Sequence, residues 1–567
     1  MISSKQHISH ALTGYGVSTH LVVVLPSPKA DGYPNDISSA ESNFGAALDY
    51  CKPDRLTLLK APYEGHIEEG VPSGIRQAIE SRGWHNLAES TEVLKILAID
   101  PYAHDWNPAE FFLNYFEPLL NGLAEDERTV FFVGPGSAFL TVFMTQMAFS
   151  VGAELISNTP FDDQGVRSAK SLAFAAEGAA GYRQLVDGKP LGEMPRKKTS
   201  MPRNALVKLL EKRSFNGRWS TARSLSGGSN LPDPLGFSQS AMTLSGLIKQ
   251  RKTDDGVKYT LTPAGLVAAI ETRRHHLNCF DSLYQGDALS LPEPVTGAHG
   301  VIAGLRTRDP DSPFEEERCN EYANGAENFD PVALVISHVS DSYPTSFSVF
   351  PSPTGMTKVF NQRGKDLIST ARSICGPDWD PQRHFVNTMD WFLSLPQHDV
   401  EWHLDVTGMT SQDQVVLSLL CHLLGIPIIY RSRKEGTGAR GMHIDMPEGT
   451  RSPSGLHQHR TPIHSVWRSI SDLIVHGSLD EEVEAVLESI VDPGQLVSKQ
   501  DYDAVVNITL ARGEQARSRV ESKLLRDGLF ARASLSGGTR GRADASGWVL
   551  TLDGRIVLAF MRAWSER

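Results

Sequence analysis

The chain has 567 residues, 40% of them hydrophobic and 22% charged, a composition that excludes disordered and fibrous proteins. This length exceeds what one hydrophobic core supports, so we expect about three to five domains. The N-terminus lacks an apolar signal segment, and no run of about 18 apolar residues occurs anywhere, so the sequence predicts a cytoplasmic protein without a membrane span. The five cysteines are far apart and form no C-x-x-C pair, which predicts reduced thiols and no structural metal site.

Charge is distributed unevenly along the chain, whose formal net charge is -12. Residues 195–274 contain 15 Lys and Arg against 5 Asp and Glu, and residues 501–567 contain 11 against 8. Two basic segments therefore alternate with acidic ones. Basic segments of this kind are typical of modules that contact nucleic acid.

The first 170 residues alternate short apolar runs with helical stretches. The runs fall at 20–28, 55–59, 93–100 and 129–136, and they are rich in β-branched and aromatic residues. Strands that alternate with helices indicate a parallel α/β sheet. We therefore expect a Rossmann-like domain over 1–170.

One strand, loop, helix and strand unit occurs twice. The first copy covers 129–157, with its strand ending at Gly134-Pro135-Gly136 and Ser137 as the helix cap; the second covers 400–432. The two copies are about 270 residues apart, which predicts an internal duplication with a second Rossmann-like domain over 330–447.

A different pattern follows each α/β unit. In the first copy we expect a helix over 238–250, a polar turn over 251–256, a strand over 258–262 and a helix over 263–274. In the second copy the corresponding segments are 514–527, 532–546, 548–551 and 552–564. Helix, wing hairpin and helix is the order of a winged helix-turn-helix domain, predicted here over 195–275 and, with a helical bridge, over 465–567. We expect polar connectors at 276–329 and 436–462.

The loops that follow the repeated strands are candidate phosphate sites. Gly134, Gly136 and Gly408 let the backbone approach a ligand closely, and a helix N-terminus presents free N–H groups to an anion. Ser137, Thr407 and Thr410 add hydroxyl donors. The alternative is that these glycines only form tight turns. Neither G-x-x-x-x-G-K-S/T nor G-x-G-x-x-G occurs in these loops, which argues against a P-loop NTPase and a standard dinucleotide enzyme.

The loop D-V-T-G-M-T at 405–410 resembles the signature loop of CARF domains, the CRISPR-associated Rossmann-fold sensors of cyclic oligoadenylates, and V-G-P-G-S at 133–137 resembles a variant of it. In that family a winged helix commonly follows the sensor domain. The resemblance implies a cyclic oligonucleotide as signalling ligand, no other cofactor, and one pocket built by two paired domains, within one chain or between two chains. It places the ligand contacts at Ser27, Pro28, Gly134, Gly136, Ser137, Asp405, Thr407, Gly408 and Thr410.

Double-stranded DNA is the expected second partner. Three of the candidate contacts lie around the first wing and four on the second recognition helix and wing: Arg251, Lys252, Lys258, Arg519, Lys523, Arg540 and Arg542. The alternative is that the winged helices only dimerise or dock another protein.

The leading hypothesis is a cyclic-oligoadenylate-sensing DNA-binding regulator of antiviral defence. One rival is an enzyme, a ring nuclease or an effector that cleaves RNA, for which no catalytic residue is identified. The basic stretch with His457, His459 and His464 has the composition of a loop and no recognisable metal-ligand spacing. Asp100, Tyr102, His104 and Asp105 follow a strand end, where they would meet a ligand. A second rival is an assembly protein without catalysis.

Overall fold

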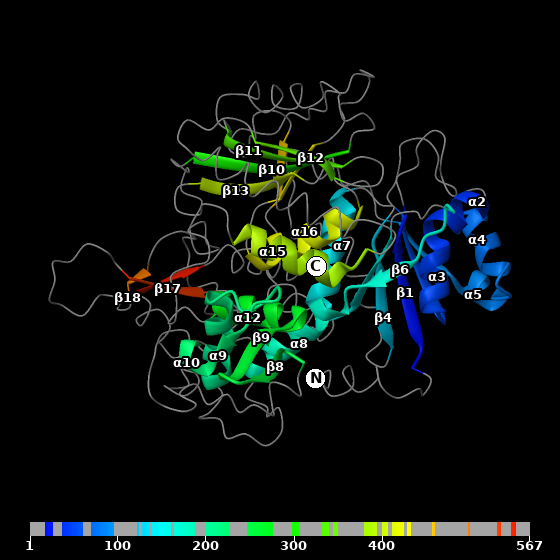
Figure 1. Ribbon diagram of the computed structural model, residues 1–567. Coiled ribbons are helices and arrows are strands. Elements are labelled where there is room, and N and C mark those ends of the chain that lie inside the picture. The colour runs from blue at the N-terminus through cyan, green and yellow to red at the C-terminus, as the bar shows by residue number, and fades with distance from the viewer. Residues whose placement is uncertain are drawn as a thin grey trace, which may run out of the picture.

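The computed structural model describes the parts of the chain that fix its α/β architecture (Figure 1). In the strands after residue 297 the structure describes the backbone only, except at Leu404, where it also describes the side chain. The described residues are 17–25, 37–60, 70–95, 119, 122–123, 127–134, 138–159, 164–186, 200–225, 246–275, 298–306, 331–339, 344–349, 379–393, 400–405, 411–424, 428–431, 456–459, 497–498, 530–534 and 546–550.

The first sheet has six strands in the order β3-β2-β1-β4-β5-β6. Five of them are parallel, and β6 pairs antiparallel with β5 at one edge. The parallel sheet that the sequence predicts is therefore confirmed. The strands are β1 (Thr19–Val24), β2 (Arg55–Lys60), β3 (Glu92–Lys95), β4 (Arg128–Phe132), β5 (Glu154–Asn158) and β6 (Ala169–Ser171).

Helices cover both faces of this sheet, which is why its central strands are rich in buried apolar residues. Figure 1 shows α3, α4 and α5 on one side of β1 and β4, and α7 on the other. The helices are α2 (Ile37–Ala40), the π-helical η1 (Glu41–Gly45), α3 (Ala46–Cys51), α4 (Ser73–Glu80), α5 (His85–Ser90), α7 (Ala138–Val151) and α8 (Ala173–Val186).

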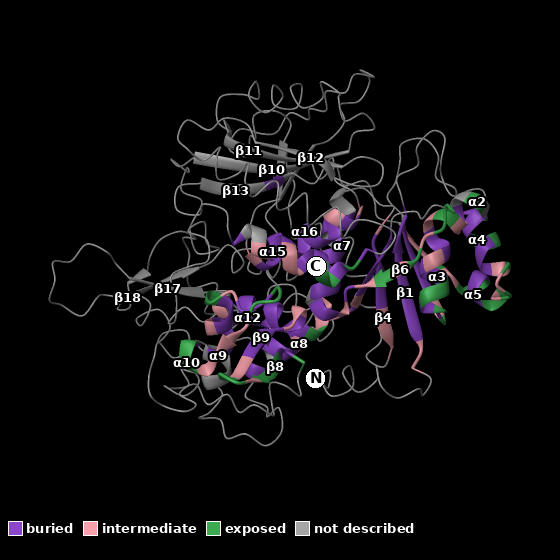
Figure 2. Cartoon of the chain, viewed as in Figure 1, coloured by how far each residue is buried: buried purple, intermediate pink, exposed green. Residues whose placement is uncertain are grey.

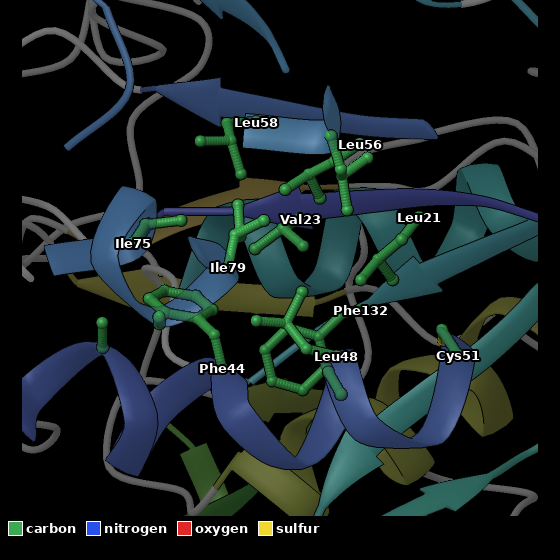
Figure 3. Close-up of a cluster of buried hydrophobic side chains, with 14 of the residues drawn as sticks. Leu21, Val23, Phe44, Leu48, Cys51, Leu56, Leu58, Ile75, Ile79 and Phe132 are labelled. Carbon is green, nitrogen blue, oxygen red and sulfur yellow. The ribbon is translucent and has the colours of Figure 1, made fainter. Parts of the chain in front are cut away.

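Alternate residues of the strands pack into the core on the first face. Figure 3 shows Phe44 and Leu48 directed toward Val23 and Phe132, and all four are at most 3% exposed. Phe44 meets the ring of Phe132 edge to face, with 6.0 Å between the ring centroids. A sheet buried on both faces, with helices on each, is compatible with a Rossmann-like fold.

The second sheet also has six strands, in the order β12-β11-β10-β13-β14-β15. Its four central strands are parallel, and the two edge strands are antiparallel to their neighbours. The strands are β10 (Ala298–Arg306), β11 (Pro331–Val339), β12 (Pro344–Val349), β13 (Val400–Asp405), β14 (Ile428–Arg431) and β15 (Leu456–His459).

Both predicted connectors need correction here. The segment 276–329 contains β10, which is a central strand of the second sheet and not part of a linker. The segment 436–462 contains β15, so His457 and His459 lie on an edge strand instead of a loop. In both cases pairing with distant strands prevails over a polar local composition.

Two small antiparallel sheets accompany the larger ones, in the orders β7-β9-β8 and β16-β18-β17. In each, the strand that is third in sequence lies between the other two. The strands are β7 (Ser220–Thr221), β8 (Ile248–Thr253), β9 (Gly256–Leu261), β16 (Val497–Ser498), β17 (Phe530–Ser534) and β18 (Ser546–Leu550). Helices α9 (Ser200–Glu211), α10 (Ala222–Leu225) and α12 (Pro263–His275) pack beside the first of these small sheets, β7-β9-β8.

The predicted helix over 238–250 is wrong at its end, because residues from Ile248 onward form β8 and pair with β9. The predicted turn shrinks to 254–255 for the same reason. The helix predicted over 263–274 is confirmed as α12, with Pro263 in its first turn and the Thr262 hydroxyl accepting from the Gly265 N–H at 2.9 Å.

The centre of the described chain is helical. Helices α15 (Pro381–Phe392) and α16 (Ser411–Leu424) join the two halves: α16 packs on α7, and α12 packs on α8, α15 and α16. Figure 2 shows buried residues along α7, α8, α12 and α16. Within the described ranges, no helix has both the length and the apolar character that crossing a membrane requires.

Candidate functional site

The predicted ligand loops follow β4 and β13. Gly134 comes just after β4, over the ring of Phe132, and Asp405 is the last residue of β13. The other predicted contacts, which lie outside the described residues, are Ser27, Pro28, Gly136, Ser137, Thr407, Gly408 and Thr410.

The two helices that follow these loops pack on each other in the same direction. Near their beginnings, Gln412 of α16 donates a hydrogen bond to the carbonyl oxygen of Asn158, at the end of β5, over 2.5 Å. Near their ends, Phe149 of α7 meets the ring of His422 of α16 edge to face, with 5.4 Å between the centroids. Since the first turn of α7 also lies at the carboxyl end of the sheet, both helix N-termini are directed to one edge.

This arrangement has an electrostatic consequence. Each helix carries a partial positive charge and unpaired N–H groups at its N-terminus. Two such ends directed to one edge favour an anion there more than either does alone, and phosphate is the usual ligand of this geometry. We call the edge formed by the ends of β4 and β5 and the first turns of α7 and α16 the shared edge.

Buried polar atoms without a hydrogen-bond partner lie at the shared edge. They are Oγ1 of Thr141 in the first turn of α7, and Oγ of Ser157 and Oδ1 of Asn158 at the end of β5, with all three residues at most 2% exposed. The side-chain nitrogen of Asn158, Nδ2, donates to the carbonyl oxygen of Asn43 at 2.9 Å, so only the side-chain oxygen Oδ1 is without a partner. Buried polar groups are normally paired, and those that are not mark sites where water or a ligand completes the bonding.

A second set of polar residues holds the first turn of α16. The Trp379 indole donates to Nδ1 of His384 at 3.1 Å, and Nε2 of His384 lies 3.3 Å from Oδ1 of Asp413. Because Nδ1 accepts the indole hydrogen bond, the imidazole proton is on Nε2, directed at the carboxylate. Asp413 is thus fixed at the N-terminal end of α16, where the helix dipole favours its charge.

Among the described side chains, cysteines are the candidate nucleophiles, and groups of His, Cys, Asp or Glu residues are the candidate metal ligands. Burial raises the pKa of Cys51 to about 12 and raises that of Cys421 well above its ordinary value, so both remain thiols. Over the part of the chain that the structure describes, no three His, Cys, Asp or Glu residues are grouped to hold a metal ion.

The β8–β9 hairpin forms a basic surface. The side chains of Lys249, Arg251 and Lys252 on β8 are all exposed. The Arg251 guanidinium stacks over the Trp219 ring, 4.4 Å from its centroid, so this arginine is held beside an aromatic face. Lys258, on β9, is less available, because its side chain is only 24% exposed and its ammonium lies 3.1 Å from the Asp255 carboxylate.

Two of the three described DNA contacts that the sequence predicts, Arg251 and Lys252, therefore lie together on one exposed strand, and Lys258 is paired beside them. The remaining four, Arg519, Lys523, Arg540 and Arg542, lie outside the described residues.

No protein-family model and no curated protein matches the chain. The functional conclusion therefore depends on the geometry of the shared edge and of the basic hairpin.

The structure adds residues that the sequence does not single out. Asn158, Gln412 and His384 are brought to the shared edge or its support by contacts between elements far apart in the chain. One local signal exists for the first of them, because the polar pair Ser157-Asn158 ends a buried strand and the carboxyl ends of parallel strands are where ligands bind. Trp219 has no such local signal, because its role depends on contact with Arg251 of β8, which is distant in the sequence.

Proposed function

We propose that this protein is a regulator that senses a cyclic oligonucleotide and binds DNA through winged helices. It would contain two Rossmann-like sensor units, each followed by a winged helix-turn-helix unit. In both large sheets the strand that comes first in the chain lies between the second strand and the strand that precedes α7 or α16. This shared strand order supports a duplicated architecture. The order first, third, second in both small sheets is that of a winged helix and favours this assignment.

The observation that carries the proposal is the parallel packing of α7 and α16, fixed by the bond from Gln412 to Asn158. It directs the first turns of both helices to the shared edge, which supports a single ligand that contacts both. A ring of nucleotides linked by phosphates presents repeated anionic groups to two helix N-termini related in this way. The resemblance of the loop at 405–410 to CARF domains narrows the class to cyclic oligoadenylates.

The DNA-binding part of the proposal is supported by the basic hairpin. Wings contact the DNA backbone with basic side chains, and phosphate contacts dominate the affinity of such modules. Arg251, Lys249 and Lys252 provide three exposed positive charges on one strand.

The test is calorimetric titration of the full chain with cyclic tri-, tetra- and hexa-adenylate, followed by chromatography of the recovered ligand. One ring should bind, Thr407→Ala should weaken that binding at least tenfold, and Thr91→Ala should not. Thr91 is a matched control because it precedes β3, at the opposite edge of the sheet, and its hydroxyl donates to the Leu87 carbonyl. Recovery of the intact ring supports a sensor, whereas a linear product would make the protein a ring nuclease.

If none of the three rings binds, the ligand assignment is wrong. DNA binding is tested separately by fluorescence anisotropy on duplex DNA at several salt concentrations. Affinity that decreases steeply with salt supports nucleic-acid binding. The absence of any DNA binding would leave the hairpin as a protein-docking surface.

A further inference from the structure

Helix α15 connects the shared edge to the winged unit of the opposite half. Asp380 caps its start, accepting from the Gln382 N–H at 3.0 Å. One turn later, His384 contacts Asp413 in the first turn of α16, directly after the second candidate ligand loop. A helix of 12 residues extends about 18 Å, so its far end reaches a different part of the molecule.

The far end of α15 is bonded to the turn after α9. Oδ2 of Asp390 accepts from Arg218 at 2.5 Å and from Asn216 at 3.3 Å. The Leu393 carbonyl accepts from Arg213. These partners lie 172 to 180 positions earlier in the chain, in the unit that contains the basic hairpin.

The turn has an unusual backbone at the residues that reach α15. Arg213 has φ 50° and Asn216 has φ 54°, both in the left-handed region that residues other than glycine seldom adopt. A conformation of this kind persists where its surroundings hold it. The side chains of both residues bond to α15, so the turn and the helix end fit each other.

The same winged unit is also held to the first half. Gly178 and Gly181 of α8 lie so close to α12 and Leu247 that an added β-carbon would approach their atoms to within 2.5 and 2.8 Å. The unit therefore contacts the first half through α8 and the second half through α15 and α16. A shift of one half against the other therefore changes the contacts of this unit as well as the direct contact between α7 and α16.

We propose that α15 transmits the ligand state of the second loop to the first winged unit, so that regulation crosses between the halves. The inference rests on the proposed function. A ligand that moves the first turn of α16 displaces Asp413 and His384, and α15 carries the displacement to Asp390 and the turn at 213–218. The orientation of the basic hairpin changes with it, because β7 directly follows this turn and pairs with β9 of the hairpin.

The first experiment measures coupling in the full chain. DNA affinity is determined with and without whichever of cyclic tri-, tetra- or hexa-adenylate binds, for the wild type, Asp390→Asn and Glu211→Gln. Asp390→Asn should keep its ligand affinity within about twofold and should reduce the effect of ligand on DNA affinity by about fivefold or more. Glu211→Gln is the matched control, because it removes an exposed ion pair that lies within α9, the pair with Lys208. A ligand response in Asp390→Asn equal to that of the wild type overturns the inference and leaves the proposed function intact.

The second experiment needs no ligand and separates failure of the inference from failure of the proposed function. Amide hydrogen exchange is compared between the wild type and Asp413→Asn. Exchange should rise in 213–218, on the far side of α15, without a rise in α9. Asp49→Asn, which removes an exposed partner of Arg82 on the opposite face of the first sheet, should change neither segment. No change at 213–218 in Asp413→Asn contradicts the inference whether or not a ring binds, and a rise throughout α9 as well would show general destabilisation and contradict it too.

Discussion

The backbone of Gly265, in the first turn of α12, lies against that of Leu247 so closely that a β-carbon on Gly265 would be 1.7 Å from the Leu247 carbonyl oxygen. No side-chain rotation relieves this contact, because the atom it meets belongs to the backbone. Gly265→Ala should therefore lower the free energy of unfolding by about 3 kcal/mol or more, beyond the usual cost of overpacking. Urea denaturation of the full chain measures the change.

Gly246→Asn is the control for that substitution. Gly246 has φ +74°, and an added β-carbon would meet nothing within 4 Å, so only the backbone preference changes. Asparagine tolerates this conformation, and the expected loss is about 1 kcal/mol or less. Equal effects of the two substitutions would show that the approach of Gly265 to Leu247 is not the cause.

His20 makes the stability of the first sheet depend on pH. The side chain is completely buried, with Nε2 2.8 Å from the Thr57 hydroxyl, and burial, together with the positive charge of Arg55, lowers its pKa from 6.5 to about 4. The distance from Nδ1 to the Glu127 carboxylate is 3.8 Å, too long for a hydrogen bond, and the neutral ring forms no ion pair there at neutral pH.

The sign of the effect follows from proton binding. Between pH 6.5 and about 4 the unfolded chain holds a proton on His20 that the folded chain does not, so stability decreases as the pH falls through this window. The difference in unfolding free energy between the wild type and His20→Leu should change by about 1 to 2 kcal/mol from pH 7 to pH 5. A constant difference over that range would refute the lowered pKa.

Much of the first sheet is predictable because its signals are local. The runs predicted at 20–28, 55–59 and 129–136 are short and rich in apolar residues, and each supplies a strand of the parallel sheet. Helices α7 and α16 are likewise confirmed where the sequence predicts them.

Elements whose formation depends on distant partners are not predicted. The strand β10 has the sequence AHGVIAGLR and lies in a polar, proline-containing region, and it becomes a strand by pairing with β11 and β13. Residues 248–250 are polar enough for a helix end, but the turn at Gly246 and pairing with β9 make them a strand. The bond from Gln412 to Asn158 joins residues 254 positions apart, and nothing near either residue predicts it.

Gln146 lies inside α7 with its side chain completely buried and neither amide atom hydrogen-bonded. Burial of an unpaired amide is unfavourable, so Gln146→Met, which keeps the approximate volume, should raise the free energy of unfolding by about 1 kcal/mol. Thr145→Val is the matched control, because this hydroxyl does donate to the Thr141 carbonyl at 2.6 Å, and its loss should lower stability by about 1 kcal/mol. A loss of stability in Gln146→Met as well would mean that a bound water or ligand pairs with the amide.

The basic hairpin makes a prediction about salt. If Lys249 and Lys252 contact DNA phosphates, each alanine substitution should weaken binding and reduce the slope of log affinity against log salt by about 1. Trp219→Ala removes the ring on which the Arg251 guanidinium stacks. It should weaken DNA binding because Arg251 is then no longer held in place. Lys208→Ala is the control, since this lysine lies on α9 and pairs with Glu211. A slope that is unchanged in Lys249→Ala and Lys252→Ala would mean that DNA, if bound, is bound by another surface, because phosphate contacts cannot be lost without a change in counterion release.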